Sequence, residues 1–93
     1  MLLPTRMAVL NHVNKVGKAS VNEVMSVLKP FYGKEKQFNE KMYLDHLMAL
    51  EANGLVSLDK YNLDANNDLV LTYSITEDGR GAVEKYVPKE YQV

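Results

Sequence analysis

Few residues of this 93-residue chain have the types and spacing that metal or acid–base chemistry requires. The two histidines, His12 and His46, are far apart, and neither has a histidine or carboxylate partner four residues away along a helix. We therefore expect both histidines to be surface or interface residues rather than metal ligands. Cysteine is absent, which excludes thiolate metal sites, thiol catalysis and disulfide bonds.

The stretch Asp64-x-Asn66-x-Asp68 has oxygen ligands at the first three positions of a calcium-binding loop. Such a loop continues with a glycine and ends with a bidentate glutamate. Leu69 and Ile75 occupy those two positions. The pattern instead favours a polar hairpin turn, because aspartate and asparagine side chains stabilise turns.

The sequence also lacks the patterns that are typical of enzymes. No motif surrounds a serine, histidine and aspartate set, there is no glycine-rich phosphate loop, and no pair of carboxylates stands out. We therefore predict that the chain is not an enzyme and that it needs no cofactor.

Charged side chains are distributed unevenly along the chain, whose net charge is −1. Residues 1–41 contain seven lysines and arginines against three glutamates, whereas residues 42–93 contain four against nine acidic residues. Such asymmetry can form a basic face, which would attract phosphates, on a nearly neutral molecule. The alternative is a mixed, solvated surface. The candidate phosphate-binding lysines are Lys15, Lys18, Lys34, Lys36 and Lys41.

Helices are predicted to position most of these lysines. They are expected at residues 4–16, 20–29, 39–53 and 77–87. Ser20 and Glu23 have the spacing of a capping box, which marks the start of the second helix. Asn39 is the expected N-cap of the third helix, with Phe38 and Tyr43 spaced for a hydrophobic staple across that cap.

Two stretches at residues 55–61 and 69–75 are rich in strand-forming residues and flank a polar loop, which predicts an antiparallel β-hairpin. Pro30 is expected to end the second helix, so that residues 31–37 form a connector. Thr76 is the expected N-cap of the last helix. The predicted fold class is therefore α+β, with the order α-α-α-β-β-α.

Length and composition predict one small domain, residues 1–93, with the 46% hydrophobic and 25% charged content of a soluble globular protein. No apolar run reaches the roughly 18 residues of a transmembrane helix. The first residues lack the basic and apolar regions of a signal peptide. We therefore expect a cytoplasmic protein without a membrane partner.

Two motifs resemble those of the winged helix-turn-helix regulators of the PadR and MarR-like groups. Leu47-Met-Ala-Leu-Glu-Ala-Asn-Gly-Leu-Val56 is similar to the "L-x-x-L-E-x-x-G-L-V" that ends the recognition helix and opens the wing. Tyr73-Ser-Ile-Thr-Glu-Asp-Gly-Arg80 is similar to the "Y-x-L-T-x-x-G-R" that ends the second wing strand. The resemblance covers residues 5–87 and implies a winged-helix fold with the hairpin as the wing.

In that family the third helix enters the major groove of DNA and the hairpin reaches the backbone or the minor groove. The resemblance therefore implies a sequence-specific, DNA-binding small transcriptional regulator that binds double-stranded DNA. Asn39 would be a possible adenine reader, because an asparagine amide can make two hydrogen bonds to adenine. The candidate DNA-contacting residues are Lys15, Lys18, Lys34, Lys36, Asn39 and Lys41.

The first and last helices have more apolar surface than a chain of this length easily buries. Together with the resemblance, this predicts a homodimer that forms through those two helices. The alternative is that the two helices pack on each other within one chain.

Two further hypotheses for the function remain open. The predicted hairpin carries Asp59, Asp64 and Asp68 against a single lysine, Lys60, and an acidic hairpin is repelled by phosphates. The second hypothesis is therefore a winged-helix protein–protein interaction module that does not bind DNA. The third is a small enzyme or ligand sensor, for which the sequence offers no residues.

Overall fold

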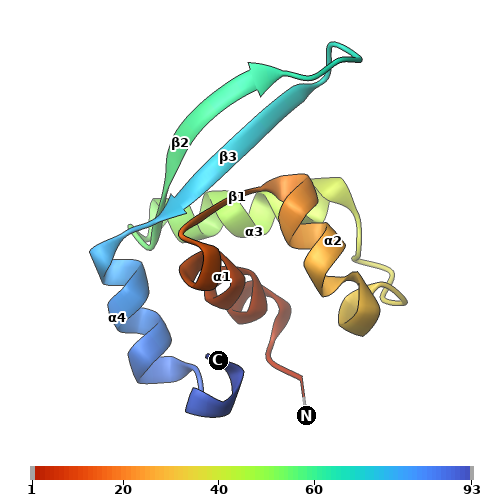
Figure 1. Cartoon of the computed structure of the whole chain (residues 1–93). Coiled ribbons are helices and arrows are strands. Elements are labelled where there is room, and N and C mark those ends of the chain that lie inside the picture. The colour runs from red at the N-terminus through yellow and green to blue at the C-terminus, as the bar shows by residue number, and fades with distance from the viewer. Residues whose placement is uncertain (1, 93) are drawn as a thin grey trace.

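The structure combines a group of helices with a small antiparallel sheet, whose two longer strands extend beyond the helices (Figure 1). It is a computed structural model that describes residues 2–92. In chain order the elements are α1 (Thr5–Val16), β1 (Lys18–Ser20), α2 (Val21–Tyr32), α3 (Glu40–Ala52), β2 (Val56–Leu63), β3 (Leu69–Ile75), α4 (Glu77–Tyr86) and the 3-10 helix η1 (Lys89–Tyr91). The predicted α+β class is confirmed, and no helix within residues 2–92 is long and apolar enough to span a membrane.

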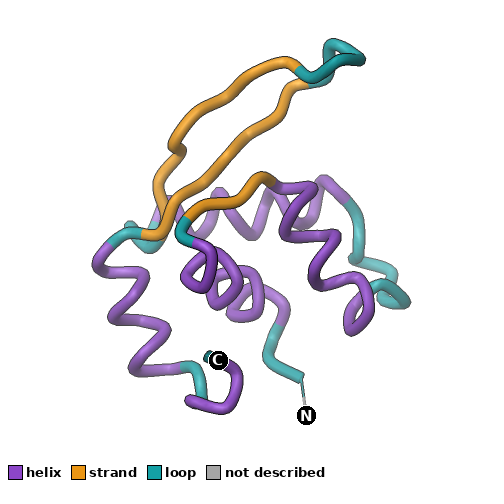
Figure 2. Tube along the Cα trace, viewed as in Figure 1, coloured by secondary structure: helices purple, strands orange, loops and turns teal. Residues whose placement is uncertain are grey.

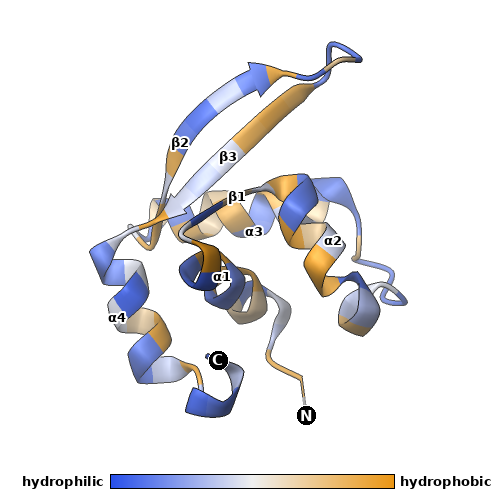
Figure 3. Ribbon diagram, viewed as in Figure 1, coloured by the Kyte–Doolittle hydropathy of each residue, from blue (hydrophilic) through white to orange (hydrophobic). Residues whose placement is uncertain are grey.

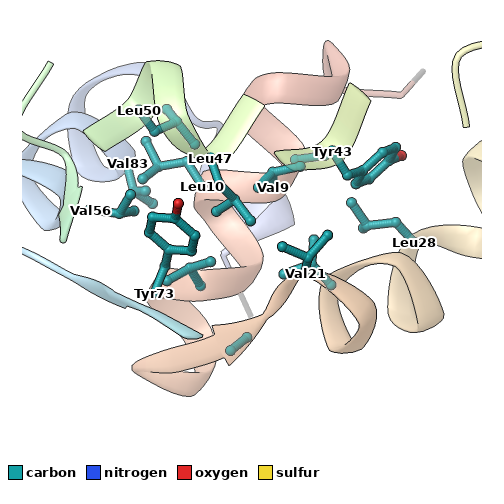
Figure 4. Close-up of a cluster of buried hydrophobic side chains, with 14 of the residues drawn as sticks. Val9, Leu10, Val21, Leu28, Tyr43, Leu47, Leu50, Val56, Tyr73 and Val83 are labelled. Atoms are coloured by element: carbon teal, nitrogen blue, oxygen red, sulfur yellow. The ribbon is translucent and has the colours of Figure 1, made fainter. Parts of the chain in front are cut away.

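Helix α1 lies at the centre of the core, where it contacts α2, α3, α4 and β3. Its side chains Leu10 and Val13 are fully buried, as are Leu47 of α3 and Val83 of α4. Figure 4 shows side chains from α1, α3, α4 and the sheet converging on one cluster. Because α1 and α4 contact each other within the chain, part of the apolar surface assigned to a dimer interface is covered without a second copy.

The predicted helix starts are confirmed by their hydrogen bonds. The backbone N–H of Glu23 donates to Oγ of Ser20 at 3.2 Å, and the Ser20 N–H donates to Oε1 of Glu23 at 2.8 Å, which completes the capping box. Oδ1 of Asn39 accepts from the backbone N–H of Met42 at 2.9 Å. The rings of Phe38 and Tyr43 meet edge to face with centroids 5.1 Å apart, which confirms the staple.

The prediction that Pro30 ends the second helix is wrong, because α2 continues to Tyr32. Proline removes one backbone donor, but the next turn still closes through the Gly33 N–H, which donates to the carbonyl of Lys29 at 2.8 Å. Tyr32 is buried, and its hydroxyl donates to the carbonyl of Leu3 at 2.5 Å. These tertiary contacts stabilise the extra residues, so the connector to α3 begins at Gly33 rather than at residue 31.

The predicted element order is also wrong in one respect, because it lacks β1. This strand pairs antiparallel with β3, with Ala19 opposite Tyr73, and gives the sheet order β1-β3-β2 (Figure 2). Three residues are too few to show an alternating pattern, and their pairing partners lie more than 50 residues away in the sequence. Sequence periodicity therefore gave no signal for β1.

The hairpin is longer than predicted, because β2 runs to Leu63 and only residues 64–68 form the loop. Oδ1 of Asp64 accepts from the backbone N–H groups of Asn66 at 2.8 Å and Asp68 at 3.0 Å. Asn67 adopts a positive φ of 68°, which asparagine tolerates better than most residues. The acidic stretch thus forms a turn that is stabilised by Asp64.

The two sequence motifs meet at the base of the hairpin. Oγ1 of Thr76 donates to the carbonyl of Gly54 at 2.7 Å, and the Thr76 backbone N–H donates to the carbonyl of Leu55 at 3.3 Å. The same Oγ1 accepts from the N–H of Gly79 at 3.0 Å, so Thr76 both caps α4 and joins it to the end of α3. These bonds fix the position of the hairpin relative to the helices.

Candidate binding groove between α3 and the hairpin

One face of the hairpin is apolar from its base to its tip. Residues directly opposite each other in antiparallel strands point to the same face. The register pairs Leu58 with Tyr73, Tyr61 with Leu71, and Leu63 with Leu69. We call this set the apolar face of the hairpin. Tyr73, at its base, is buried in the core beside α1 and α3 (Figure 4).

A β-bulge keeps these residues on one face. Leu58 and Tyr61 are three residues apart and would point to opposite faces of a regular strand. The register shifts by one residue between Leu58 and Lys60, so that Asp59 is the extra residue of β2. Lys60 consequently lies opposite Thr72, on the other face, and Tyr61 lies opposite Leu71.

The outer part of the apolar face is exposed to solvent. Tyr61 is 71% exposed, Leu63 58% and Leu69 59%. Hydrophobic residues occupy the outer half of β3 and the end of β2 in Figure 3. Exposed apolar residues are ordinary when they are scattered, but a contiguous group marks an interaction surface.

A groove lies where β3 passes the start of α3 and the start of α2. It has a volume of about 330 Å³ and is lined on the apolar side by Val21, Leu44, Leu69 and Leu71. Glu40 and Lys41, from the first turn of α3, line its polar side. We call it the hairpin groove. The apolar face of the hairpin continues from this groove to the tip.

The helix α3 and the hairpin are acidic as a whole, although the hairpin groove itself is lined by one carboxylate, Glu40, and one lysine, Lys41. The elements α3, β2 and β3 with their connecting turn carry six carboxylates and two lysines. The carboxylates are Glu40, Asp45, Glu51, Asp59, Asp64 and Asp68. Asp59 lies 3.8 Å from Nζ of Lys18, and this is the only ion pair among residues 2–92 that the structure contains. A ligand with apolar and cationic groups would complement this surface.

The predicted DNA-contacting lysines fall into two groups. Lys34 and Lys36 lie in the connector after α2, and Lys41 lies in the first turn of α3. Lys15 and Lys18 lie before α2, at the end of α1 and in β1. A bidentate contact between Asn39 and adenine would compete with its capping bond to Met42.

The two histidines are half-buried and have different neighbours. Nε of Arg6 donates to Nδ1 of His46 at 3.2 Å, and burial, together with the charge of Arg6, lowers the pKa of His46. Burial also lowers the pKa of His12, and Lys15 adds to this effect. Both imidazoles are therefore favoured in their neutral form.

The apolar residues near the hairpin tip were not predicted as functional residues. Their only signal in the sequence is that Leu63 and Leu69 flank the polar turn directly, where a hairpin tip is ordinarily polar. Comparison with known proteins adds no assignment, because no protein family, curated protein or solved structure gives a significant match.

Proposed function

We propose that this chain is a winged-helix protein–protein interaction module, in which the hairpin groove and the apolar face of the hairpin bind a partner protein. The element order and the junction between Thr76 and Gly54 support the winged-helix assignment. The observation that carries the function is the continuous apolar face, whose outer residues Tyr61, Leu63 and Leu69 are more than half exposed.

The partner segment that fits this surface has apolar side chains with lysine or arginine beside them. Apolar side chains would remove Tyr61, Leu63 and Leu69 from water, which provides most of the binding free energy of an interface. The cationic residues would face Glu40 and Asp45 on α3 and increase the association rate. DNA fits less well, because its phosphates would face the same carboxylates.

Site-specific photo-crosslinking tests this function in the cell of origin. A benzophenone amino acid replaces Tyr61 in one variant and Tyr86 in the control, because Tyr86 is an exposed tyrosine of α4 outside the groove. We expect Tyr61 to crosslink to one protein that is absent from the Tyr86 sample, and Leu63→Ser to abolish this crosslink. Crosslinking of the same partner protein at both positions, or no crosslink at Tyr61 to a protein other than the chain itself, would refute the proposal.

Charge reversal on α3 then separates a basic protein partner from DNA. Asp45→Lys should weaken binding of the crosslinked partner, whereas Lys41→Glu should strengthen it. Binding to duplex DNA would change in the opposite direction for each variant. Both side chains are exposed, so neither substitution is expected to alter the fold.

A second candidate function is that of a DNA-binding transcriptional regulator, which one observation favours. Lys34 and Lys36 lie in the connector before α3 and Lys41 lies in its first turn, where the helix dipole attracts phosphates, and no carboxylate among residues 2–92 pairs with them. If this function holds, the chain binds duplex DNA at about 50 mM salt with a steep salt dependence. A variant with all three lysines replaced by alanine would then lose binding while it keeps its fold.

The predicted homodimer is tested separately by the mass of the chain in solution. The exposed Tyr86 of α4 and Val16 of α1 are the large apolar side chains that those two helices leave for a second copy. A mass equal to one chain at all concentrations would exclude the dimer.

A further inference from the structure

The outer part of the hairpin is a ribbon of only two strands. Strand β1 pairs with residues 72–74 of β3, so that no third strand among residues 2–92 lies beside residues 61–63 and 69–71. A two-stranded ribbon is at best marginally stable by itself in water, and further strands stabilise it. The outer hairpin is therefore the part of the sheet that gains most from an added strand.

Strand β2 forms an edge of the sheet, and the backbone groups of Tyr61 and Leu63 point away from β3. The Asp64 N–H donates to the carbonyl of Asp68 at 2.9 Å, which makes these two residues a hydrogen-bonded pair. Hydrogen-bonded and non-hydrogen-bonded pairs alternate along antiparallel strands. The next pair, Leu63 with Leu69, is therefore non-hydrogen-bonded, and so is the pair that contains Tyr61, two residues further along β2. The N–H and C=O groups of Tyr61 and Leu63 consequently point outward from the sheet.

Protection of this edge against pairing with another strand ends at the bulge. Proteins protect edge strands with bulges, charged side chains and prolines. Strand β2 has its bulge at Asp59, and the charged Lys60 follows it. The next three residues, Tyr61, Asn62 and Leu63, include neither a charged residue nor a proline. The outer edge of β2 is thus open to a further strand.

The residues around Asn62 are complementary to a second copy of themselves. When two β2 strands pair antiparallel with Asn62 opposite Asn62 of the second copy, Tyr61 lies opposite Leu63 of that copy. The outward backbone groups of Tyr61 and Leu63 then form two hydrogen-bonded pairs. Lys60 lies opposite Asp64 of the second copy, and opposite charges at such positions stabilise a sheet. Neither Lys60 nor Asp64 has an ion-pair partner among residues 2–92.

We propose that two copies of the chain associate through the edges of their β2 strands, antiparallel and centred on Asn62, so that the two hairpins form one continuous sheet. Each hairpin extends beyond its helices (Figure 1), so the helices of the two copies lie at opposite ends of this sheet. The pairing uses backbone groups, and it places the two apolar faces side by side as one larger surface. It does not depend on the proposed partner protein, and it differs from the dimer predicted through α1 and α4.

A single cysteine tests this register, because the chain has no cysteine of its own. Asn62→Cys places two thiols directly opposite each other in a non-hydrogen-bonded pair, where the side chains are close enough for a disulfide bond. Lys60→Cys is the matched control, because Lys60 is exposed on the same face of β2 but lies opposite Asp64 of the second copy. In a glutathione redox buffer, the linked dimer of Asn62→Cys should form at least about tenfold faster, because the pairing raises the effective concentration of its thiols.

Analytical ultracentrifugation then measures the association without a covalent link. Lys60→Glu should weaken the dimer about tenfold, because it places two carboxylates opposite each other at both ends of the pairing. N-methylation of the Leu63 backbone nitrogen, introduced by chemical synthesis, should abolish the dimer, because it removes an outward donor and leaves the side chain unchanged. Tyr86→Ser is the control, because Tyr86 is an exposed residue of α4, and this variant should associate as the wild type does.

Four results would each overturn the proposal. They are a wild-type mass of one chain at all concentrations, equal rates of disulfide formation in the two cysteine variants, unchanged association after N-methylation of Leu63, and loss of the dimer in Tyr86→Ser. Because the crosslink at Tyr61 identifies a different protein, the proposed function and this pairing can fail independently of each other.

Discussion

Replacement of Gly79 by alanine should strongly destabilise the chain, although alanine is ordinarily the better helix former. An added Cβ at this position would lie 2.0 Å from the carbonyl oxygen of Leu55 and 2.6 Å from Cδ1 of Ile75. Gly79 is in the first turn of α4, where the helix meets the residues that follow α3. The added Cβ would clash with the backbone of Leu55 as well as with the side chain of Ile75, so a rotamer change of Ile75 alone cannot relieve the clash.

The expected cost follows from the distance that α4 must move. Carbon and carbonyl oxygen atoms in close contact are about 3.3 Å apart, so the start of α4 would shift by about 1.3 Å. Overpacking of this kind costs about 1–3 kcal/mol. The shift would also weaken the two hydrogen bonds from Thr76 to Gly54 and Leu55, at about 1 kcal/mol each. The sum is about 3–5 kcal/mol if both hydrogen bonds are lost.

Gly81 provides a matched control two residues further along α4. Apart from its chain neighbours and its own helix backbone, a Cβ at Gly81 would meet no atom of residues 2–92 within 4 Å, so alanine there should stabilise the helix by about 0.5–1 kcal/mol. Thermal and urea unfolding, followed by circular dichroism, measures the free energy of unfolding of both variants. A loss of about 3 kcal/mol in this free energy lowers the melting temperature by about 12–24 °C in a domain of this size. Equal stabilities of Gly79→Ala and Gly81→Ala would refute the close approach of α4 to Leu55.

Three smaller perturbations test individual contacts. Tyr43→Phe should leave the free energy of unfolding in urea unchanged or raise it by up to about 1 kcal/mol. The reason is that the Tyr43 hydroxyl is buried without a hydrogen-bond partner among the described residues. The same burial raises the pKa of Tyr43 to about 12. Asn39→Ala should cost about 1 kcal/mol in the same assay, because it removes the cap of α3. Lys15→Ala should raise the pKa of His12 in an NMR titration, because Lys15 disfavours the charged imidazole. Since the pKa of His12 is lower in the folded chain than the unfolded value of 6.5, its contribution to stability is present above pH 6.5 and is lost as the pH falls through the folded pKa.

The helix starts could be predicted from the sequence because each depends on residues only three positions apart. The bonds between Ser20 and Glu23, Asn39 and Met42, and Thr76 and Gly79 are local, so composition and spacing are sufficient to identify them. The extension of α2 beyond Pro30 is different, because it depends on the contact of Tyr32 with Leu3. No local pattern contains that information.

The candidate binding groove was less predictable than the fold. The acidic character of the hairpin was evident from Asp64 and Asp68, but its apolar face was not, because half of that face comes from β2 and half from β3. Which residues share a face depends on the register of the two strands. The pocket between α1, α2 and the residues after α4 was hidden for a similar reason, since Asn11 and Tyr91, which both line it, are 80 residues apart.

The bulge at Asp59 explains why β2 showed only imperfect alternation in the sequence and why the hairpin has an apolar face. In a regular strand, Lys60 would be the next residue after Leu58 on the apolar face. Tyr61 would then point to the face opposite to that of Leu71. The extra residue places Lys60 with the polar residues and brings Tyr61 and Leu63 over to the side of the groove. The same residue lies 3.8 Å from Nζ of Lys18 on β1, the strand at the opposite edge of the sheet. A single additional residue therefore determines that the exposed end of the hairpin is apolar on the side that faces α3.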